Sequence, residues 1–353
     1  MKFLIQFSGV ALGLAISLYI PLEKPRPLWW RWIAITLLTL MTVLALGLPI
    51  AGTFSDAVLL KRIGAAHPQV PVKVRVHAVL PNNQHPMDGF VFYVMTDARD
   101  EDPVQAIVRV PVHIASQLTI GQTAILQVER DSLGIDNMFF VHRLVTNTPF
   151  LTLPYIPQLE ERARNLYFHV PMSWVGMLAY IVAMVFGIRY LITRTMLDDI
   201  ISSSAAALGT LYTILATLTG AIWAKFNWGT FWNWDPRQTS IFILLMIYSA
   251  YFALRQAIDT TERRARISAA YVVFAIVPAI FLMFIMPRMM EGLHPGSAND
   301  ANVGPILSTS SDDLNLIKQA IFSLAFGGFT MLFFWMLSLH IRIHRTRLAQ
   351  EQE

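Results

Sequence analysis

The chain has 353 residues, of which 55% are hydrophobic and only 14% are charged. Soluble domains carry about 25% charged residues, so this composition excludes a water-soluble protein and indicates an integral membrane protein. The absence of cysteine excludes disulfides and thiolate metal sites, and the net charge of +4 comes mostly from basic residues beside apolar runs, which excludes nucleic acid as the expected partner.

Seven apolar runs predict membrane-spanning helices, since a span needs about 20 such residues. The runs cover about 3–21, 32–51, 172–193, 202–224, 239–257, 267–287 and 316–341. The first run follows Met1-Lys2 and also fits a signal peptide, so its cleavage stays open. The predicted fold class is mainly α, a polytopic membrane helix bundle of about seven spans.

Basic residues predict the sidedness of these spans, because Lys and Arg accumulate in cytoplasmic loops. Twelve lie after the first, third, fifth and seventh spans, whereas five lie in the short segments on the other side. We therefore expect a multi-pass protein of the cytoplasmic membrane, surrounded by lipid, with its N-terminus outside and its C-terminus in the cytoplasm.

The long segment between the second and third spans changes to a period of two, which is typical of strands. Alternating runs occupy 70–80, 89–98, 104–112, 123–130 and 138–145. They predict a small closed barrel or sandwich, with an oligonucleotide-binding type barrel among the alternatives. The expected division is an N-terminal helix pair at 1–56, an inserted all-β extracytoplasmic domain at 57–160 and a five-helix membrane core at 161–347.

The loop between the fourth and fifth spans is unusually rich in tryptophan. Its indoles alternate with polar residues rather than standing alone, as the side chains of an interfacial aromatic belt would. If residues 228–235 form a short helix, Trp228, Trp232 and Asp235 share one face. Together with Trp234 and Arg237, that face suits a large planar ligand with carboxylate edges, because indoles stack and guanidinium groups bind carboxylates.

Two histidines lie at span ends on the same predicted side as this loop. His169 precedes the third span, where Pro171 is expected in the first helical turn, and His294 follows the sixth span. A single interfacial histidine is more commonly structural. Two imidazoles that face each other beside an indole-lined surface could instead ligate haem iron axially.

Three segments resemble the CcmC family of haem-handling proteins, part of a superfamily with CcmF and CcsA. They are the Tyr-Phe-His-Val-Pro segment that begins at Tyr167, the Trp-Gly-x-x-Trp-x-Trp-Asp loop that begins at Trp228, and Leu-His-Pro at 293–295. The resemblance covers about 150–345. It implies haem binding at the outer face, with His169 and His294 as axial ligands and with a platform formed by Trp228, Trp232, Trp234 and Asp235.

The same resemblance implies that haem b is carried without a covalent bond and is passed to a CcmE-type chaperone. An ATP-binding cassette complex of the CcmA, CcmB and CcmD type would assist its release. The chain would then be a transfer protein in cytochrome c maturation rather than an enzyme that breaks a substrate bond. From its charge alone, Arg237 is expected to pair with a haem propionate.

Two departures leave other functions open. Pro236 makes the loop read Trp-Asp-Pro, as in CcsA and CcmF, which favours a CcsA-type synthase that attaches haem to the CxxCH motif of an apocytochrome. The extra first span and the β-rich insertion also lie outside the usual six-span pattern. A transporter or structural protein with merely interfacial tryptophans is the third alternative, although we expect no charged substrate or proton pathway within the spans to support it.

Overall fold

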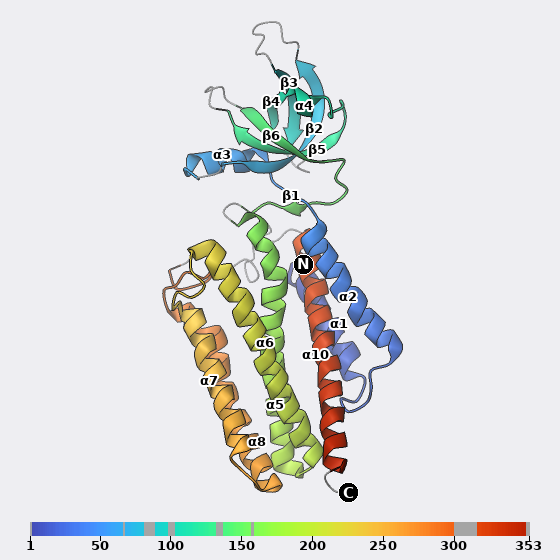
Figure 1. Ribbon diagram of the computed structural model, residues 1–353, viewed down its shortest axis with the longest axis vertical. Helices are drawn as coiled ribbons and strands as arrows, with labels where there is room; N and C mark the ends of the chain where they lie inside the picture. Colours follow the sequence, from blue (N-terminus) through green and yellow to red (C-terminus); the bar gives the residue numbers. More distant parts are fainter. Residues whose placement is uncertain are drawn as a thin grey trace. The chain divides into compact units, whose positions relative to one another are not determined.

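The computed structural model describes residues 2–65, 68–80, 89–97, 103–131, 137–156, 159–299 and 316–350. The chain divides into two compact units, one formed by Met1–Leu46 and Arg164–Glu353 and the other by Gly47–Ala163. The first unit is helical, and the second contains a β-barrel (Figure 1). A mainly helical chain with a small barrel domain confirms the expected fold class at this level.

Antiparallel helices of very different length build the helical unit. They are α1 (Lys2–Leu18), α2 (Leu28–Gly47), α5 (Leu166–Thr193), α6 (Met196–Trp228), α7 (Pro236–Gln256), α8 (Thr261–Ile280), the π-helical turn η2 (Phe281–Ile285), α9 (Met286–Met289) and α10 (Leu316–Gln350). Within the described residues, six helical stretches are long and apolar enough to cross a membrane. Each overlaps one expected span, whereas the apolar stretch of α1, Phe7–Leu18, is shorter.

The helices of this unit run side by side and alternate in direction (Figure 1). Helices α5 and α6 pack against each other, α8 packs on α5, α7 packs on α8, and α10 contacts α5 and α6. This alternation brings the start of α5, the end of α6, the start of α7 and the segment after α9 to one end of the unit. Three connections that are distant in the sequence therefore meet there.

One charged cluster lies inside the helical unit where the sequence predicted none. Helix α6 begins at Met196 rather than near 202, so Asp198 and Asp199 belong to its first turn, where both are buried. Arg255 forms two hydrogen bonds with Asp199, at 2.7 and 2.9 Å. The pair joins α6 to α7, and because Arg255 lies within the expected span 239–257, the expected absence of charged residues from the spans was wrong.

The barrel contains the five strands that the alternating pattern predicted. They are β2 (Val70–Leu80), β3 (Phe90–Asp97), β4 (Gln105–Pro111), β5 (Thr123–Arg130) and β6 (Met138–Asn147), with the short helix α4 (Val112–Ala115) after β4. They close in the order β2-β3-β4-β6-β5, which decides for a barrel over a sandwich. Alternate residues such as Val72, Val74 and Val108 fill the interior, because successive side chains point to opposite faces.

Short elements precede and follow the barrel in the sequence. Strands β1 (Ile50–Ala51) and β7 (Leu153–Pro154) pair in parallel, and the 3₁₀ helix η1 (Glu160–Asn165) leads towards α5. Helix α3 (Phe54–Arg62) begins with a capping box, in which the side chains of Thr53 and Asp56 accept each other's backbone N–H. These contacts satisfy backbone N–H groups at the start of α3, which has only nine residues.

Candidate functional site

His169 lies in the first turn of α5 and faces α6. Its Nδ1 is 3.0 Å from the carbonyl oxygen of Ala216 and 3.1 Å from Oγ1 of Thr219. Because a carbonyl can only accept, Nδ1 carries the ring proton and Nε2 keeps its lone pair. The expected position of Pro171 in the first helical turn was wrong, since α5 begins five residues earlier, at Leu166, and includes this proline in its interior.

The ring of His169 packs directly against the backbone of α6. A Cβ added at Gly220 would lie 2.9 Å from Cε1 of His169, closer than real Cβ contacts allow. Gly220 therefore makes the space in which the imidazole can reach the Ala216 carbonyl. Neither this glycine nor the carbonyl has a sequence signal that would reveal its role, since both act through backbone geometry.

The tryptophan loop is not the short helix that was expected over 228–235. Helix α6 continues to Trp228 and ends there because Gly229 adopts the left-handed conformation, with φ of 83°. Residues 230–235 then form an irregular loop up to the N-cap of α7 at Asp235. The predicted helical face shared by Trp228, Trp232 and Asp235 is therefore wrong.

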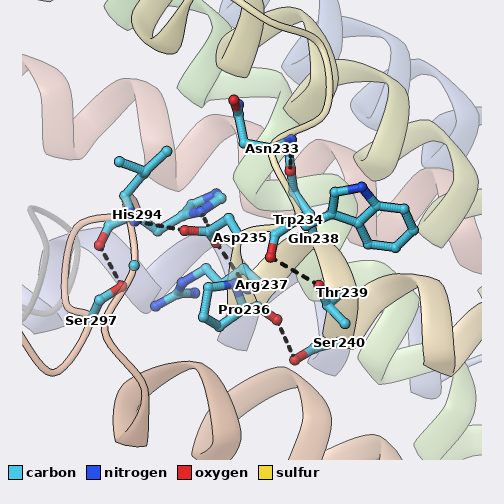
Figure 2. A network of polar contacts seen from close by, with 12 residues as sticks. Asn233, Trp234, Asp235, Pro236, Arg237, Gln238, Thr239, Ser240, His294 and Ser297 are labelled. Atoms are coloured by element: carbon cyan, nitrogen blue, oxygen red, sulfur yellow. Dashed lines mark hydrogen bonds and ion pairs between the residues drawn. The ribbon is translucent and has the colours of Figure 1, made fainter.

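Side-chain amides and hydroxyls hold this loop in place instead. The backbone N–H of Asn233 donates to Oε1 of Gln238 at 2.8 Å, and the Thr239 hydroxyl donates to the carbonyl of Trp234 at 3.2 Å (Figure 2). Trp234 has φ of +54°, a conformation that non-glycine residues adopt rarely. This strained residue directly precedes Asp235, whose side chain turns towards His294 while the Trp234 side chain is 68% exposed.

Asp235 and His294 form the central contact of the site. Oδ1 of Asp235 is 2.7 Å from Nδ1 of His294, and its Oδ2 accepts the backbone N–H of Leu293 at 2.6 Å (Figure 2). Although burial raises the pKa of Asp235, the hydrogen bonds from His294 and from the amides of Leu293 and Arg237 outweigh it and lower this pKa to about 2. The carboxylate is therefore ionised, so Nδ1 of His294 carries the proton and Nε2 is free to bind a metal.

The structure brings some of the expected site residues into contact. Trp228 packs edge-on against His294, with ring centroids 4.7 Å apart. Trp232 and Trp234 contact each other at 5.7 Å, and each also contacts Phe242 of α7. The indoles therefore form two groups, one beside His294 and one against α7.

Arg237 lies in the first turn of α7, where its backbone N–H donates to Oδ1 of Asp235 at 2.9 Å. Within the described part of the chain, its buried Nε has no hydrogen-bond partner. The segments that carry His169 and His294, which are the start of α5 and the loop after α9, lie at the same end of the helical unit. This site combines two free Nε2 atoms, indole rings and a guanidinium, a donor set suited to a planar, anionic metal complex.

Sequence comparisons with known proteins point to one family. The family model described as "Heme exporter protein C" (CcmC) matches residues 137–352. The Heme exporter protein C of Bradyrhizobium diazoefficiens is 33% identical over 197 residues, which are 55% of this chain and 70% of that protein. The Heme exporter protein C of Rhodobacter capsulatus is 29% identical over 210 residues, 58% of this chain and 83% of that protein.

Other relatives carry related descriptions. The Heme exporter protein C of Escherichia coli K12 is 30% identical over 134 residues, 38% of this chain and 54% of that protein. A putative cytochrome c biosynthesis ccmC-like mitochondrial protein of Marchantia polymorpha is 42% identical over 91 residues, 26% of this chain and 40% of that protein. Because the family model spans more than half of the chain, the protein belongs to the Heme exporter protein C (CcmC) family.

Proposed function

We propose that the protein binds haem through Nε2 of His169 and Nε2 of His294 and takes part in haem export for cytochrome c maturation. The observation that carries this proposal is the tautomer that both rings share. Nδ1 of each ring donates its proton to an oxygen of the protein, so Nε2 of each ring keeps a lone pair. Haem supplies an iron with two axial positions, which neutral imidazoles fill. Trp228, Trp232 and Trp234 would offer indole surface to the porphyrin.

Arg237 is the proposed partner of a propionate. Its buried Nε lacks a partner in the described residues, and a carboxylate from the ligand would supply one. Guanidinium groups bind carboxylates in a planar, paired geometry that an ammonium group does not reproduce. A propionate at this position would also bring the porphyrin edge close to the start of α7.

Release to a carrier follows from the position of the site at an end of the helical unit. Trp234 and Phe231 are strongly exposed there, so a bound haem would be accessible to another protein. We propose that haem b, held without a covalent bond, passes to a CcmE-type chaperone with the help of CcmA, CcmB and CcmD type subunits. The chain then acts as a transfer protein and not as a bond-breaking enzyme.

The proposed placement in the membrane has seven spans, with α1 as the first. The N-terminus and the haem site then lie outside the cytoplasm, as the distribution of Lys and Arg predicts. Residues 47–163 would also lie on that outer side. Protease or cysteine-labelling accessibility at Glu291, near the site, and at Arg345, in α10, distinguishes this orientation from its inverse.

Haem ligation is tested by reconstituting the purified protein with haem and recording its absorption spectrum. We expect a low-spin bis-histidine spectrum, which His169→Ala and His294→Ala each convert to a high-spin form with reduced haem content. His344→Ala, in α10, serves as the matched control and should leave the spectrum unchanged. Unaltered ligation in both single variants would exclude His169 and His294 as the ligands.

The CcsA-type synthase remains the second candidate, and its main support was Pro236. In the structure Pro236 occupies the first position of α7, directly after the N-cap Asp235. Proline is favoured there because that N–H has no intrahelical partner, so helix geometry explains this residue without a synthase activity. Thioether product formed from an apocytochrome without any chaperone would favour the synthase.

A further inference from the structure

Both oxygens of the Asp235 carboxylate accept hydrogen bonds from within the protein. It accepts hydrogen bonds from Nδ1 of His294, from the backbone N–H of Leu293 and from the backbone N–H of Arg237, at 2.7, 2.6 and 2.9 Å. Its side chain is 1% exposed. Asp235 therefore has no surface left to offer to a planar ligand, although the sequence placed it in the platform.

His169 has a different kind of partner. Its Nδ1 donates to the carbonyl of Ala216 at 3.0 Å, and the second neighbour, Oγ1 of Thr219, is neutral as well. The Thr219 hydroxyl itself donates to the carbonyls of Leu215 and Ala216. Both candidate ligands thus carry the ring proton on Nδ1. The group that accepts this proton is a charged carboxylate for His294 and a neutral carbonyl for His169.

This difference changes how strongly each imidazole donates to a metal. A carboxylate that accepts the N–H of a ligating histidine raises the basicity of the other ring nitrogen, and a carbonyl does so less. A more basic ligand stabilises ferric iron more than ferrous iron, because the ferric ion carries the larger charge. The same hydrogen bond fixes the orientation of the ring.

We infer that Asp235 is a positioning residue that makes His294 the more strongly donating of two unequal ligands and thereby favours the ferric form of bound haem. This inference rests on the proposed function. Asp235 also joins the tryptophan loop to the segment that carries His294. The Trp-Asp sequence would then serve two purposes: its indoles would contact the porphyrin, and its carboxylate would orient His294.

Gly292 gives an independent way to disturb this contact. A Cβ at this position would lie 2.7 Å from Oδ2 of Asp235 and 3.0 Å from Oγ of Ser297. Gly292→Ala should therefore displace the carboxylate without removing its charge. Asp235→Asn is the complementary change, because asparagine remains a good N-cap and a possible acceptor but carries no charge.

The first test is a redox titration of the haem-loaded protein. Loss of such an outer partner commonly changes metal affinity by about 10-fold, and a 10-fold loss of ferric preference corresponds to a rise in midpoint potential of about 59 mV. We expect a rise of this order in Asp235→Asn and in Gly292→Ala. Thr219→Val, beside His169, should change the ferric preference less than twofold, and equal potentials in all four proteins would overturn the inference.

The second test uses the haem-free protein, so it separates this inference from the proposed function. With ¹⁵N-labelled histidine, NMR should show His294 protonated at Nδ1, and Asp235→Ala should lose that preference. A wild-type His294 protonated at Nε2 would overturn the inference. Failure of the wild-type protein to bind haem, with the expected tautomer intact, would instead contradict the proposed function and the ferric preference that rests on it, and would leave the orienting role of Asp235 in place.

Discussion

Two histidines of the barrel and the two candidate ligands of the helical unit form their hydrogen bonds through different ring nitrogens. In the barrel, Nε2 of His77 is 2.8 Å from Oγ1 of Thr96, and Nε2 of His142 is 3.0 Å from Oε2 of Glu129. In the helical unit, His169 and His294 form their hydrogen bonds within the protein through Nδ1 and not through Nε2. The comparison teaches that residue type alone does not identify a ligand, because the nitrogen engaged within the protein decides which one can bind a metal.

The units also differ in how their cores are stabilised. The barrel interior is filled by aliphatic side chains of alternating strand positions, such as Val74 and Leu126. The helical unit buries the Asp199–Arg255 pair and brings helices into contact through glycines. Substitutions in one unit should therefore unfold that unit and leave the other intact, and three variants test this from the largest expected effect to the smallest.

The largest effect is expected from Asp199→Ala. Arg255 would lose both hydrogen bonds while it remains largely buried, and an unpaired buried charge costs about 3–5 kcal/mol. Thermal unfolding in detergent should show a large loss of stability for the helical unit, while the backbone amides of strands β2 to β5 stay protected from hydrogen exchange. Arg263→Ala in α8 is the control, since that residue is exposed and its removal should cost below about 1 kcal/mol.

An intermediate effect is expected from Leu126→Ala in strand β5. Leu126 is fully buried in the barrel, and such truncations cost about 2–5 kcal/mol because they leave a cavity. Hydrogen exchange should accelerate across the barrel strands, and haem content after reconstitution should match the wild type. Val79→Ala is the matched control, because this side chain is 45% exposed. A loss of haem in Leu126→Ala alone would show that the two units are coupled.

The smallest effect is expected from Gly9→Leu in α1. A Cβ at Gly9 would lie 1.8 Å from the carbonyl oxygen of Ser323 in α10, so the two helices must move apart. Overpacking of this kind costs about 1–3 kcal/mol. Trypsin digestion of the detergent-solubilised protein should release α1 faster than in the wild type. Gly47→Leu, at a site with nothing within 4 Å of the added Cβ, should digest at the wild-type rate.

The positions of strands and helices were predictable because each depends on a local pattern of apolar residues in the sequence. The five barrel strands occur within two residues of the expected runs, and the six long apolar helices overlap the expected spans. The tryptophan loop was described wrongly, because spacing of three and four residues suggested a helix. Gly229 ends α6 in a left-handed conformation, and a single backbone angle of this kind overrides a periodic pattern.

By itself, the sequence determined the membrane character of the protein, the strands of its barrel and the histidines and tryptophans that could handle haem. These features follow from composition, hydrophobic period and side-chain chemistry, which every residue carries with it. Only the tertiary structure decided that Asp235 lies behind His294, that the Ala216 carbonyl lies behind His169 and that Gly220 admits its ring. These contacts join residues 47 to 59 positions apart or involve backbone atoms, so no local pattern encodes them.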